Sequence, residues 1–339
     1  MTRPLTFHAD PPVEVLGLPS GDEQFLKALR LSPDSRHCLV CDDSKVFCCP
    51  LDLLAQTQMY DFYEEQSLEW SLRSLSGLLL HHPRGESIYD LVWWPGMTSD
   101  DPATCCFLVS RRDHPVHLVD ACSGEVRCSY RMHNQVDEVE AATALTFNLT
   151  GDKIYAGCNR MIRIFDVNSP GATALSQPTS RTRRHPLGQK GLISCPAFNP
   201  DHCGVSVHSL PATLLTHLRH TQLALTLTAL EFTWRTKRVI RLFLCSHFYS
   251  TSIESVLDLT SIGFGVTSLR WSPCGRYLWI GGRNCSTISC WDLRGTREEV
   301  GKVHRCLNTN QRMTFDLDLW GKRFITDYLS PVFDLKEIG

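Results

Sequence analysis

The sequence WSPCGRYLWIGGRNCSTISCWD, at residues 271–292, holds an aromatic residue, a tight turn and two short apolar strands, the second of which ends at Asp292. Residues 147–166, FNLTGDKIYAGCNRMIRIFD, repeat this arrangement and end at Asp166. Apolar residues alternate along the strands, and glycine with small polar residues marks the turn. A unit that recurs along a chain predicts a repeat architecture.

The repeated unit is typical of the WD40 repeat, in which four antiparallel strands form one blade of a β-propeller. A chain of 339 residues fits one such ring. We therefore predict an all-β fold, an incomplete WD40 β-propeller with about five to six blades represented. The predicted blades begin near Phe25, Ser87, Asp137, Gly191, Val266 and Asn310.

One stretch departs from the repeat. Blade four starts with a regular strand and turn at 191–202, but residues 203–262 contain few acidic residues and no glycine turn after residue 204. The aromatic anchors Phe198 and Trp271 are 73 residues apart, whereas a blade spans about 40–45 residues. We therefore expect that the fourth blade is disrupted and lacks its outer strands, and that the last blade is missing.

These boundaries divide the chain into four parts. The expected parts are an irregular N-terminal lead at 1–21, blades one to the start of four at 22–202, an anomalous insert at 203–262, and blade five with part of blade six at 263–339.

The composition of the chain restricts its possible cellular location and binding partners. The net charge of −2 provides no global basic field, so contact with RNA requires local basic patches. No apolar run approaches the roughly 20 residues that span a bilayer, and the N-terminus lacks the apolar core of a signal peptide. We therefore expect an intracellular protein without a membrane partner.

Sixteen cysteines without a secretion signal indicate free thiols in a reducing compartment. Cys38 and Cys41 form a C-x-x-C pair with Cys48 and Cys49 close behind, which is one pattern of a zinc site. The alternative is that HCLVC and KVFCC are neighbouring strands of a blade, in which cysteine is a small buried apolar residue. We favour the strands and expect no metal, because no further Cys or His pair completes a zinc set.

Motifs for catalysis are not found in the sequence. It contains no G-x-S-x-G, no Gly-Lys-Ser phosphate loop, no H-E-x-x-H and no dinucleotide-binding glycine pattern. His, Asp and Ser are plentiful, but no acid, base and nucleophile stand at a meaningful spacing. We therefore predict a protein that is not an enzyme, with no cofactor and no small-molecule substrate.

Several phrases between the repeats are more specific than the repeats themselves. In chain order they are IYDLVWW (88–94), SRRDHPVHLVD (110–120), HNQVDEVEAATALTF (133–147), GCNRMIRIFD (157–166), QKGLISCPAFNP (189–200) and TNQRMTFDLD (309–318). Together they resemble the telomerase Cajal body protein family of WD-repeat proteins. The resemblance covers about residues 22–202 and 266–326; one departure is Val119, where the family's strand usually has Trp.

The resemblance implies a nuclear propeller that binds box H/ACA small Cajal-body RNAs and telomerase RNA with their ribonucleoproteins. It implies binding to the CAB-box loop of these RNAs, delivery of the ribonucleoprotein to the Cajal body, and support of telomere maintenance. It also implies a cytoplasmic folding stage assisted by the cytosolic chaperonin, because a propeller closes through slow, non-local pairing.

Basic residues near the blade ends are the candidates for RNA contact. Arginine supplies both a charge for phosphates and a plane for stacking on bases. Their recurrence near blade ends predicts one positive face of the ring. The tentative RNA-binding residues are Arg111, Arg112, Arg160, Arg163, Arg181, Arg183, Arg184, Lys190 and Arg312.

Structural roles remain open for several of these residues. Arg163 lies in the strand IRIFD and is better explained as a solvated or salt-bridged strand residue. Arg112 can pair with the adjacent Asp113 and order the turn, and Arg312 can be a buried structural arginine in an apolar strand. The cluster Arg181, Arg183 and Arg184 can be a solvated loop or a nuclear-import patch.

Other residues in these phrases are better explained by the blade itself. His114 and His117 are expected to make hydrogen bonds within the blade. The tryptophans of the strands are expected in the blade cores, namely Trp93, Trp94, Trp271 and Trp291. A generic WD40 protein-interaction scaffold without RNA binding remains the alternative function.

Overall fold

The computed structural model describes residues 27–41, 43, 45–50, 86–134, 138–171, 174–179, 191–198, 200, 223–227, 241–245, 255–258, 265–292, 298–304, 312–321, 323–326 and 333–334. Every regular element within these ranges is a β-strand, and the strands form several antiparallel sheets of four. The prediction of an all-β propeller is confirmed. No helix of the described part is long and apolar enough to cross a membrane.

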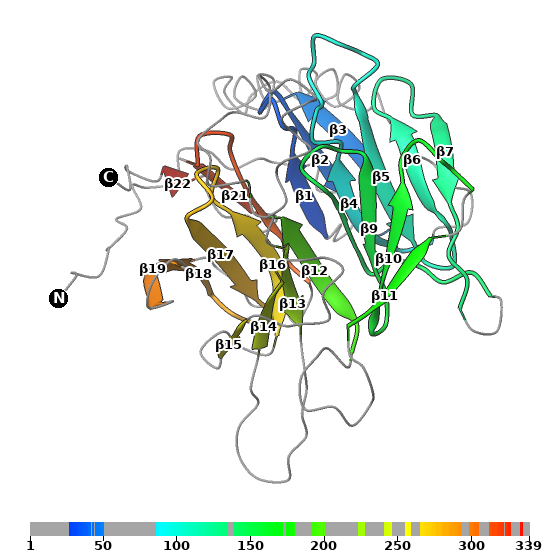
Figure 1. The fold of residues 1–339 in the computed structure, drawn as a ribbon. Coiled ribbons are helices and arrows are strands. Elements are labelled where there is room, and N and C mark those ends of the chain that lie inside the picture. Colours follow the sequence, from blue (N-terminus) through cyan, green and yellow to red (C-terminus); the bar gives the residue numbers. More distant parts are fainter. Residues whose placement is uncertain are drawn as a thin grey trace, which may run out of the picture.

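The first three sheets follow the chain in order (Figure 1). The first sheet contains β1 (Ala28–Leu31), β2 (His37–Cys41) and β3 (Val46–Pro50). The second contains β4 (Ile88–Trp93), β5 (Cys106–Arg111), β6 (Val116–Asp120) and β7 (Val126–Tyr130). The third contains β8 (Ala144–Phe147), β9 (Lys153–Gly157), β10 (Met161–Asp166) and β11 (Leu175–Pro178).

The remaining sheets continue in the same way. The fourth contains β12 (Ile193–Phe198), β13 (Leu223–Leu227), β14 (Arg241–Cys245) and β15 (Ser255–Asp258). The fifth contains β16 (Val266–Trp271), β17 (Tyr277–Gly282), β18 (Thr287–Asp292) and β19 (Glu298–His304). The sixth contains β20 (Phe315–Leu317), β21 (Arg323–Thr326) and β22 (Phe333–Asp334).

The fourth sheet corrects one expectation. Residues 203–262 were expected to replace the outer strands of blade four, but β13, β14 and β15 come from this range and pair with β12 in one antiparallel sheet. The strand sequences LALTL and RLFLC are apolar enough to pair in this way. The sequence gives only weak signals for these strands, because β13 and β14 lack the acidic strand end that marks the other blades. The proposed domain boundaries themselves stay predictions.

The inner strand of each sheet lies beside the inner strand of the next. The order of contact is β1, β4, β8, β12, β16 and β20, and β20 returns to β1. The N–H of Leu29 on β1 donates to Thr314 Oγ1 at 3.1 Å, and the N–H of Leu31 donates to Asp316 Oδ2 at 3.0 Å. The described sheets therefore close in a cycle through side chains of the last sheet and the main chain of the first.

The hydrophobic core lies between neighbouring sheets, as expected of stacked blades. Trp93 and Phe107 pack edge to face, with ring centroids 5.7 Å apart, in the layer between the first and second sheets. Trp271 is buried between the fourth and fifth sheets, where Trp291 packs partly buried against it. Trp94 packs in the same way against the layer between the second and third sheets. The expectation that these tryptophans are core aromatics is confirmed.

The cysteines of the C-x-x-C region lie on two neighbouring strands, as expected. Cys38 pairs with Cys49 and Leu39 with Cys48 in the register between β2 and β3. Cys38 and Cys41 are buried, and Cys48 is half-buried. No three His, Cys, Asp or Glu side chains of the described ranges stand together as metal ligands.

The ring has two ends with different turns. The inner strands begin at one end, which we call the entry end, and this end also carries the turns between second and third strands. Thr143 Oγ1 donates to the Ile193 carbonyl, and Ser194 Oγ to the Val266 carbonyl, so successive inner strands begin side by side. The opposite end, the exit end, carries the turns between first and second strands.

Candidate nucleic-acid interface

Arg112 and Arg283 occupy equivalent places at the entry end. Each follows the last residue of a second strand, β5 or β17, and its N–H donates to the carbonyl just before the inner strand of the same sheet. The acceptors are Ser87 for Arg112, at 3.0 Å, and Gly265 for Arg283, at 2.6 Å. Both arginines are exposed. Their repeated position places a guanidinium at the same end of two different sheets.

The expected local pairing of Arg112 with Asp113 is present. Arg112 Nε lies 3.5 Å from Asp113 Oδ2, and both side chains are mostly exposed to solvent. An exposed ion pair of this kind contributes little and is screened by salt. The Arg112 guanidinium therefore stays accessible to a phosphate, although it also orders the turn.

Arg160 lies in the turn between β9 and β10, with a positive φ of 59°. This conformation is unfavourable for a residue with a Cβ and is held here by main-chain hydrogen bonds. The Arg160 N–H donates to the Gly191 carbonyl at 3.0 Å, and the Thr179 N–H donates to the Arg160 carbonyl at 3.1 Å. Among the described residues, no side-chain hydrogen bond or ion pair engages the half-buried guanidinium.

Thr179 and Gly191 flank the basic segment SRTRRHPLGQK, residues 180–190, in the sequence. Its candidate residues lie outside the described residues, so their positions stay predictions; they are Arg181, Arg183, Arg184 and Lys190. The two described residues that flank residues 180–190 nevertheless both bond to the main chain of Arg160. The chain therefore enters and leaves this basic segment at the entry end, beside Arg160.

Arg111 differs sharply from its neighbour Arg112. It is the last residue of β5 and is only 4% exposed. Burial lowers the pKa of its guanidinium, and the nearby charge of Glu86 acts in the opposite direction. Arg111 therefore points its side chain into the protein rather than toward a polyanion.

Arg163 is also engaged by the protein. Its guanidinium donates to Ser176 Oγ and, at 3.0 Å, to the His133 carbonyl, and it lies 3.6 Å from Glu140 Oε2. These contacts join β10 to β11 and to the chain before β8. They match the salt-bridged strand residue that the sequence left open as the alternative.

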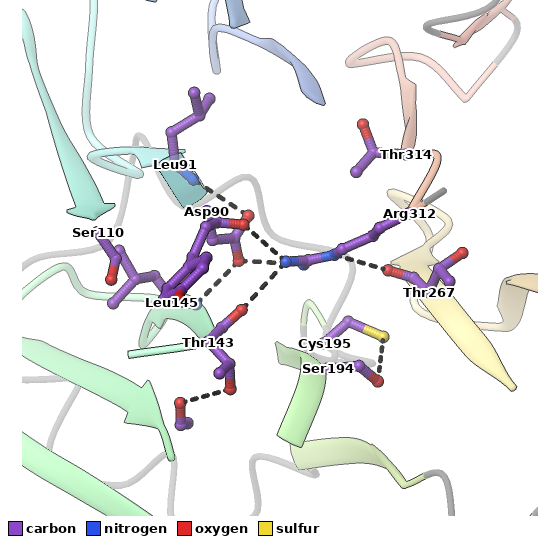
Figure 2. Close-up of polar contacts among 12 residues, drawn as sticks. Asp90, Leu91, Ser110, Thr143, Leu145, Ser194, Cys195, Thr267, Arg312 and Thr314 are labelled. Carbon is purple, nitrogen blue, oxygen red and sulfur yellow. Dashed lines mark hydrogen bonds and ion pairs between the residues drawn. The ribbon is translucent and has the colours of Figure 1, made fainter. Parts of the chain in front are cut away.

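Arg312 lies on the inner side of the ring (Figure 2). Its Nη1 donates to the carbonyls of Tyr89, at 2.8 Å, and Thr143, at 3.0 Å, and its Nε donates to the Thr267 carbonyl at 3.4 Å. Its Nη2 lies 3.5 Å from Asp90 Oδ2. One side chain thus joins the second, third and fifth sheets to the sixth, which supports the buried structural role.

Asp90 and Asp316 organise the charges around Arg312. Asp90 accepts from Arg30 Nη2 at 3.1 Å and from the Leu145 N–H at 2.9 Å. Asp316 accepts from Arg270 Nε at 2.7 Å. Burial lowers the pKa of Arg30, and the charge of Arg270 lowers it further. Because these charges are buried and paired, they hold sheets together rather than face a ligand.

The histidines of the D-H-P-V-H phrase are bonded within the second blade. His117 Nδ1 lies 2.8 Å from Ser129 Oγ, across the pair β6 and β7. His114 Nε2 contacts the Glu86 carboxylate. These contacts are of the kind expected for hydrogen-bonding histidines of a blade.

The candidate interface is therefore the entry end, with Arg112, Arg160 and Arg283 among its described cations. Sequence reasoning missed Arg283. The signal was present, since R-D at 112–113 and R-N at 283–284 both follow a second strand, and Asp113 and Asn284 both have positive φ. Guanidinium groups spaced around one end of a ring suit phosphate contacts and base stacking.

Known proteins resemble the chain over most of its length, although no family model matches it. It is 33% identical over 287 residues to the telomerase Cajal body protein 1 homolog of Drosophila melanogaster, covering 82% of this chain and 46% of that protein. It is 28% identical over 323 residues to telomerase Cajal body protein 1 of Rattus norvegicus, covering 94% and 52%.

A third relative has a different name. The chain is 28% identical over 245 residues to guanine nucleotide-binding protein negative regulator 1 of Schizosaccharomyces pombe, covering 69% of this chain and 52% of that protein. The chain spans about half the length of the curated relatives it matches. The matches in animals confirm the resemblance that the phrases between the repeats indicate. By its sequence, the chain is a relative of the telomerase Cajal body protein family.

Proposed function

We propose that the chain is a non-enzymatic RNA-binding WD-repeat protein that binds small Cajal-body RNAs and telomerase RNA. It directs the bound ribonucleoprotein to the Cajal body and so supports telomere maintenance. The names of its relatives point to telomerase, to the Cajal body and therefore to the nucleus. The names of the relatives do not mention RNA binding. The proposal that this chain binds RNA therefore rests on its own residues.

The observation that carries the proposal is the arrangement around Arg160. Its main chain bonds to both residues that flank the basic segment, and its guanidinium lacks a described partner. Arg112 and Arg283 stand at the same end of the ring. Cations from three sheets therefore lie at the entry end, where the chain also enters and leaves the basic segment, and this favours an RNA loop over a single phosphate.

The test is RNA binding by the full chain at several salt concentrations. The probe is a labelled box H/ACA stem-loop with a CAB-box loop, compared with the same stem carrying a scrambled loop. We expect the native loop to bind more tightly, with an affinity that falls steeply as salt rises. Replacing Arg181, Arg183 and Arg184 with Ala should reduce the salt slope by about 2, because three phosphate contacts to a single strand are lost.

Arg276→Ala is the matched control, because Arg276 is an exposed arginine at the exit end. It should leave the affinity and the salt slope unchanged. Equal loss in the control and in the triple variant would show a non-specific charge effect. Absence of any binding preference for the native loop would contradict the proposal.

Folding of this protein is proposed to involve the cytosolic chaperonin during a cytoplasmic stage. The contact between β1 and β20 joins residues from opposite ends of the described chain, and such long-range pairing forms slowly. Slow closure leaves apolar blade faces exposed for longer, which is the condition under which a chaperonin assists folding.

A protein-interaction scaffold without RNA binding is the second candidate. The relative from Schizosaccharomyces pombe favours it, because its name describes a regulator of a guanine nucleotide-binding protein. Sequencing of RNA crosslinked to the chain in cells separates the two candidates. Enrichment of box H/ACA RNAs supports the escort, and recovery at background level supports the scaffold.

A further inference from the structure

An exposed tryptophan marks the exit end. Trp320 is 67% exposed and the adjacent Leu319 is 46% exposed, and both lie in the turn between β20 and β21. Trp320 is the only aromatic residue among the exposed large apolar residues of the described part. A solvent-exposed tryptophan indicates a contact surface, because tryptophan is enriched at the centres of protein interfaces.

Neighbouring sheets hold this turn in place. Gly321 has a φ of +66°, and its N–H donates to the Asp318 carbonyl at 3.0 Å. A Cβ at Gly321 would stand 2.9 Å from Pro273 in the fifth sheet, so the turn is packed against that sheet. On the other side, the Leu319 N–H donates to Ser35 Oγ of the first sheet at 3.1 Å. A turn fixed at both sides presents Trp320 with little entropy left to lose on binding.

Carboxylates continue the surface from this turn. Ser35 belongs to the same exit-end turn as Asp34, and Asp34 Oδ2 accepts from the N–H of Ser99 in the second sheet at 2.8 Å. The second-sheet turn ends in the exposed pair Asp100 and Asp101. Three neighbouring turns, at 32–36, 94–105 and 318–321, thus form one connected surface.

The charge of this surface is negative. Arg36 is the basic residue of these three turns, and it pairs with Asp100 at 2.8 Å. Arg127 also donates to the carbonyls of Pro102 and Ala103, but it is neutralised by Asp120 at 2.6 Å. Burial raises the pKa of Asp34, but hydrogen bonds from Ser32, Ser99 and main-chain N–H groups outweigh it and hold that pKa below its usual value. Asp34 is therefore ionised at neutral pH.

We propose that this exit-end surface, formed by Leu319 and Trp320 with Asp34, Asp100 and Asp101, docks an arginine-rich segment of a partner protein. A guanidinium stacks on the face of an indole and pairs with a carboxylate at the same time. RNA is disfavoured here, because the carboxylates repel its phosphates. The two ends of the ring would then bind RNA and a basic protein separately.

The probe is a labelled peptide of alternating Arg and Gly, titrated with the full 339-residue chain and followed by fluorescence anisotropy. Trp320→Ala should weaken binding by about tenfold or more, as is usual when an aromatic anchor is removed. A peptide with Lys in place of every Arg should bind about threefold or more weakly, because an ammonium stacks less well on an indole.

Two further variants locate the site. Asp100→Asn combined with Asp101→Asn should weaken the Arg peptide and flatten its salt dependence, while it leaves a neutral peptide unaffected. Leu175→Ala is the matched control, since Leu175 is also an exposed apolar residue, at 59%, but lies on β11. It should bind the peptide as the unmodified chain does.

Three outcomes would overturn the assignment. They are unchanged affinity in Trp320→Ala, tighter binding of an aliphatic peptide than of the Arg peptide, and self-association of the chain that Trp320→Ala abolishes. The result is independent of the RNA proposal, because Trp320→Ala should leave RNA binding intact and the entry-end variants should leave peptide binding intact. Failure of one proposal is therefore distinguishable from failure of the other.

Discussion

Arg312 and Tyr89 stand 223 positions apart in the sequence, yet the guanidinium of one donates to the carbonyl of the other. The same side chain also serves the carbonyls of Thr143 and Thr267. An arginine can do this because its planar fork presents five donors in fixed directions. Sequence reasoning grouped Arg312 with the RNA contacts, but its hydrogen bonds connect neighbouring sheets of the ring.

Replacing Arg312 with Leu should lower the free energy of unfolding by about 2–4 kcal/mol, because the carbonyls lose a donor and the Asp90 carboxylate loses one of its two cations. Urea denaturation of both proteins measures the difference. Arg312→Lys retains the positive charge but not the planar guanidinium, so it should lower the free energy of unfolding by an intermediate amount. Arg276→Leu, at an exposed position, should change stability by less than about 0.5 kcal/mol. An unfolding midpoint for Arg312→Leu equal to that of the unmodified chain would contradict this role.

Arg111 and Arg112 show that residue type alone does not decide whether a side chain is buried or exposed. Arg111 and Arg112 are adjacent, but Arg111 ends β5, whose residues are all buried, whereas Arg112 lies in the turn that follows and is exposed. The sequence indicated a basic pair at a blade end. Only the position of the neighbouring sheet decides which member of the pair faces solvent.

At the scale of elements, the turn between β8 and β9 fixes one sheet against another. Gly151 has a φ of +74°, and its carbonyl accepts from Trp94 Nε1 at 3.0 Å. A Cβ at Gly151 would stand 2.4 Å from that same nitrogen. The turn glycine of the repeat thus permits both the local conformation and the close approach of a tryptophan from the preceding sheet.

Gly151→Ala should destabilise the protein in two ways. The positive φ costs about 1–2 kcal/mol, and the displaced indole adds to that loss. Gly171→Ala separates the two effects, because Gly171 has a φ of +87° but no atom within 4 Å of its Cβ position. Thermal unfolding of both variants should therefore give the larger loss for Gly151→Ala. Equal losses would show that the contact with Trp94 carries no strain.

Elements with strong local signals were predicted well. The strand ends at Asp166 and Asp292 and the paired strands around Cys38 and Cys48 all follow from alternation and turn residues. Sequence reasoning missed the strands β13, β14 and β15, because the chain from 205 to 262 contains no glycine and only three acidic residues to mark turns. Their pairing with β12 is decided by the neighbouring sheet edge, which no local pattern reveals.

At the scale of the whole molecule, the contact between β1 and β20 closes the cycle of sheets. Two side chains of the sixth sheet, Thr314 and Asp316, accept the N–H groups of Leu29 and Leu31. Among the described strands no β-ladder joins these sheets. Closure therefore depends on a few hydrogen bonds and on the packing of inner strands.

Thr314→Val tests this closure, because valine keeps the shape of threonine but removes the acceptor for the buried Leu29 N–H. Leaving that group unpaired costs about 1–3 kcal/mol, so amide exchange in β1 should accelerate roughly tenfold while exchange in β8–β10 stays unchanged. Thr146→Val, in the third sheet, is the control and should leave β1 protected. Unchanged exchange at Leu29 would show that packing alone closes the ring.

The sequence by itself determined the repeat, the all-β propeller and the likeness to telomerase Cajal body proteins, because alternation, turn residues and short phrases are local signals. Only the tertiary structure decided that Arg312 fastens sheets, that Arg111 is buried, that Arg160 lies beside the ends of a basic segment, and that Trp320 is presented among carboxylates. Each of these depends on which residues, distant in the chain, the ring brings together. Contacts between sheets leave no periodic pattern in the sequence, so the candidate site could be located only from the tertiary structure.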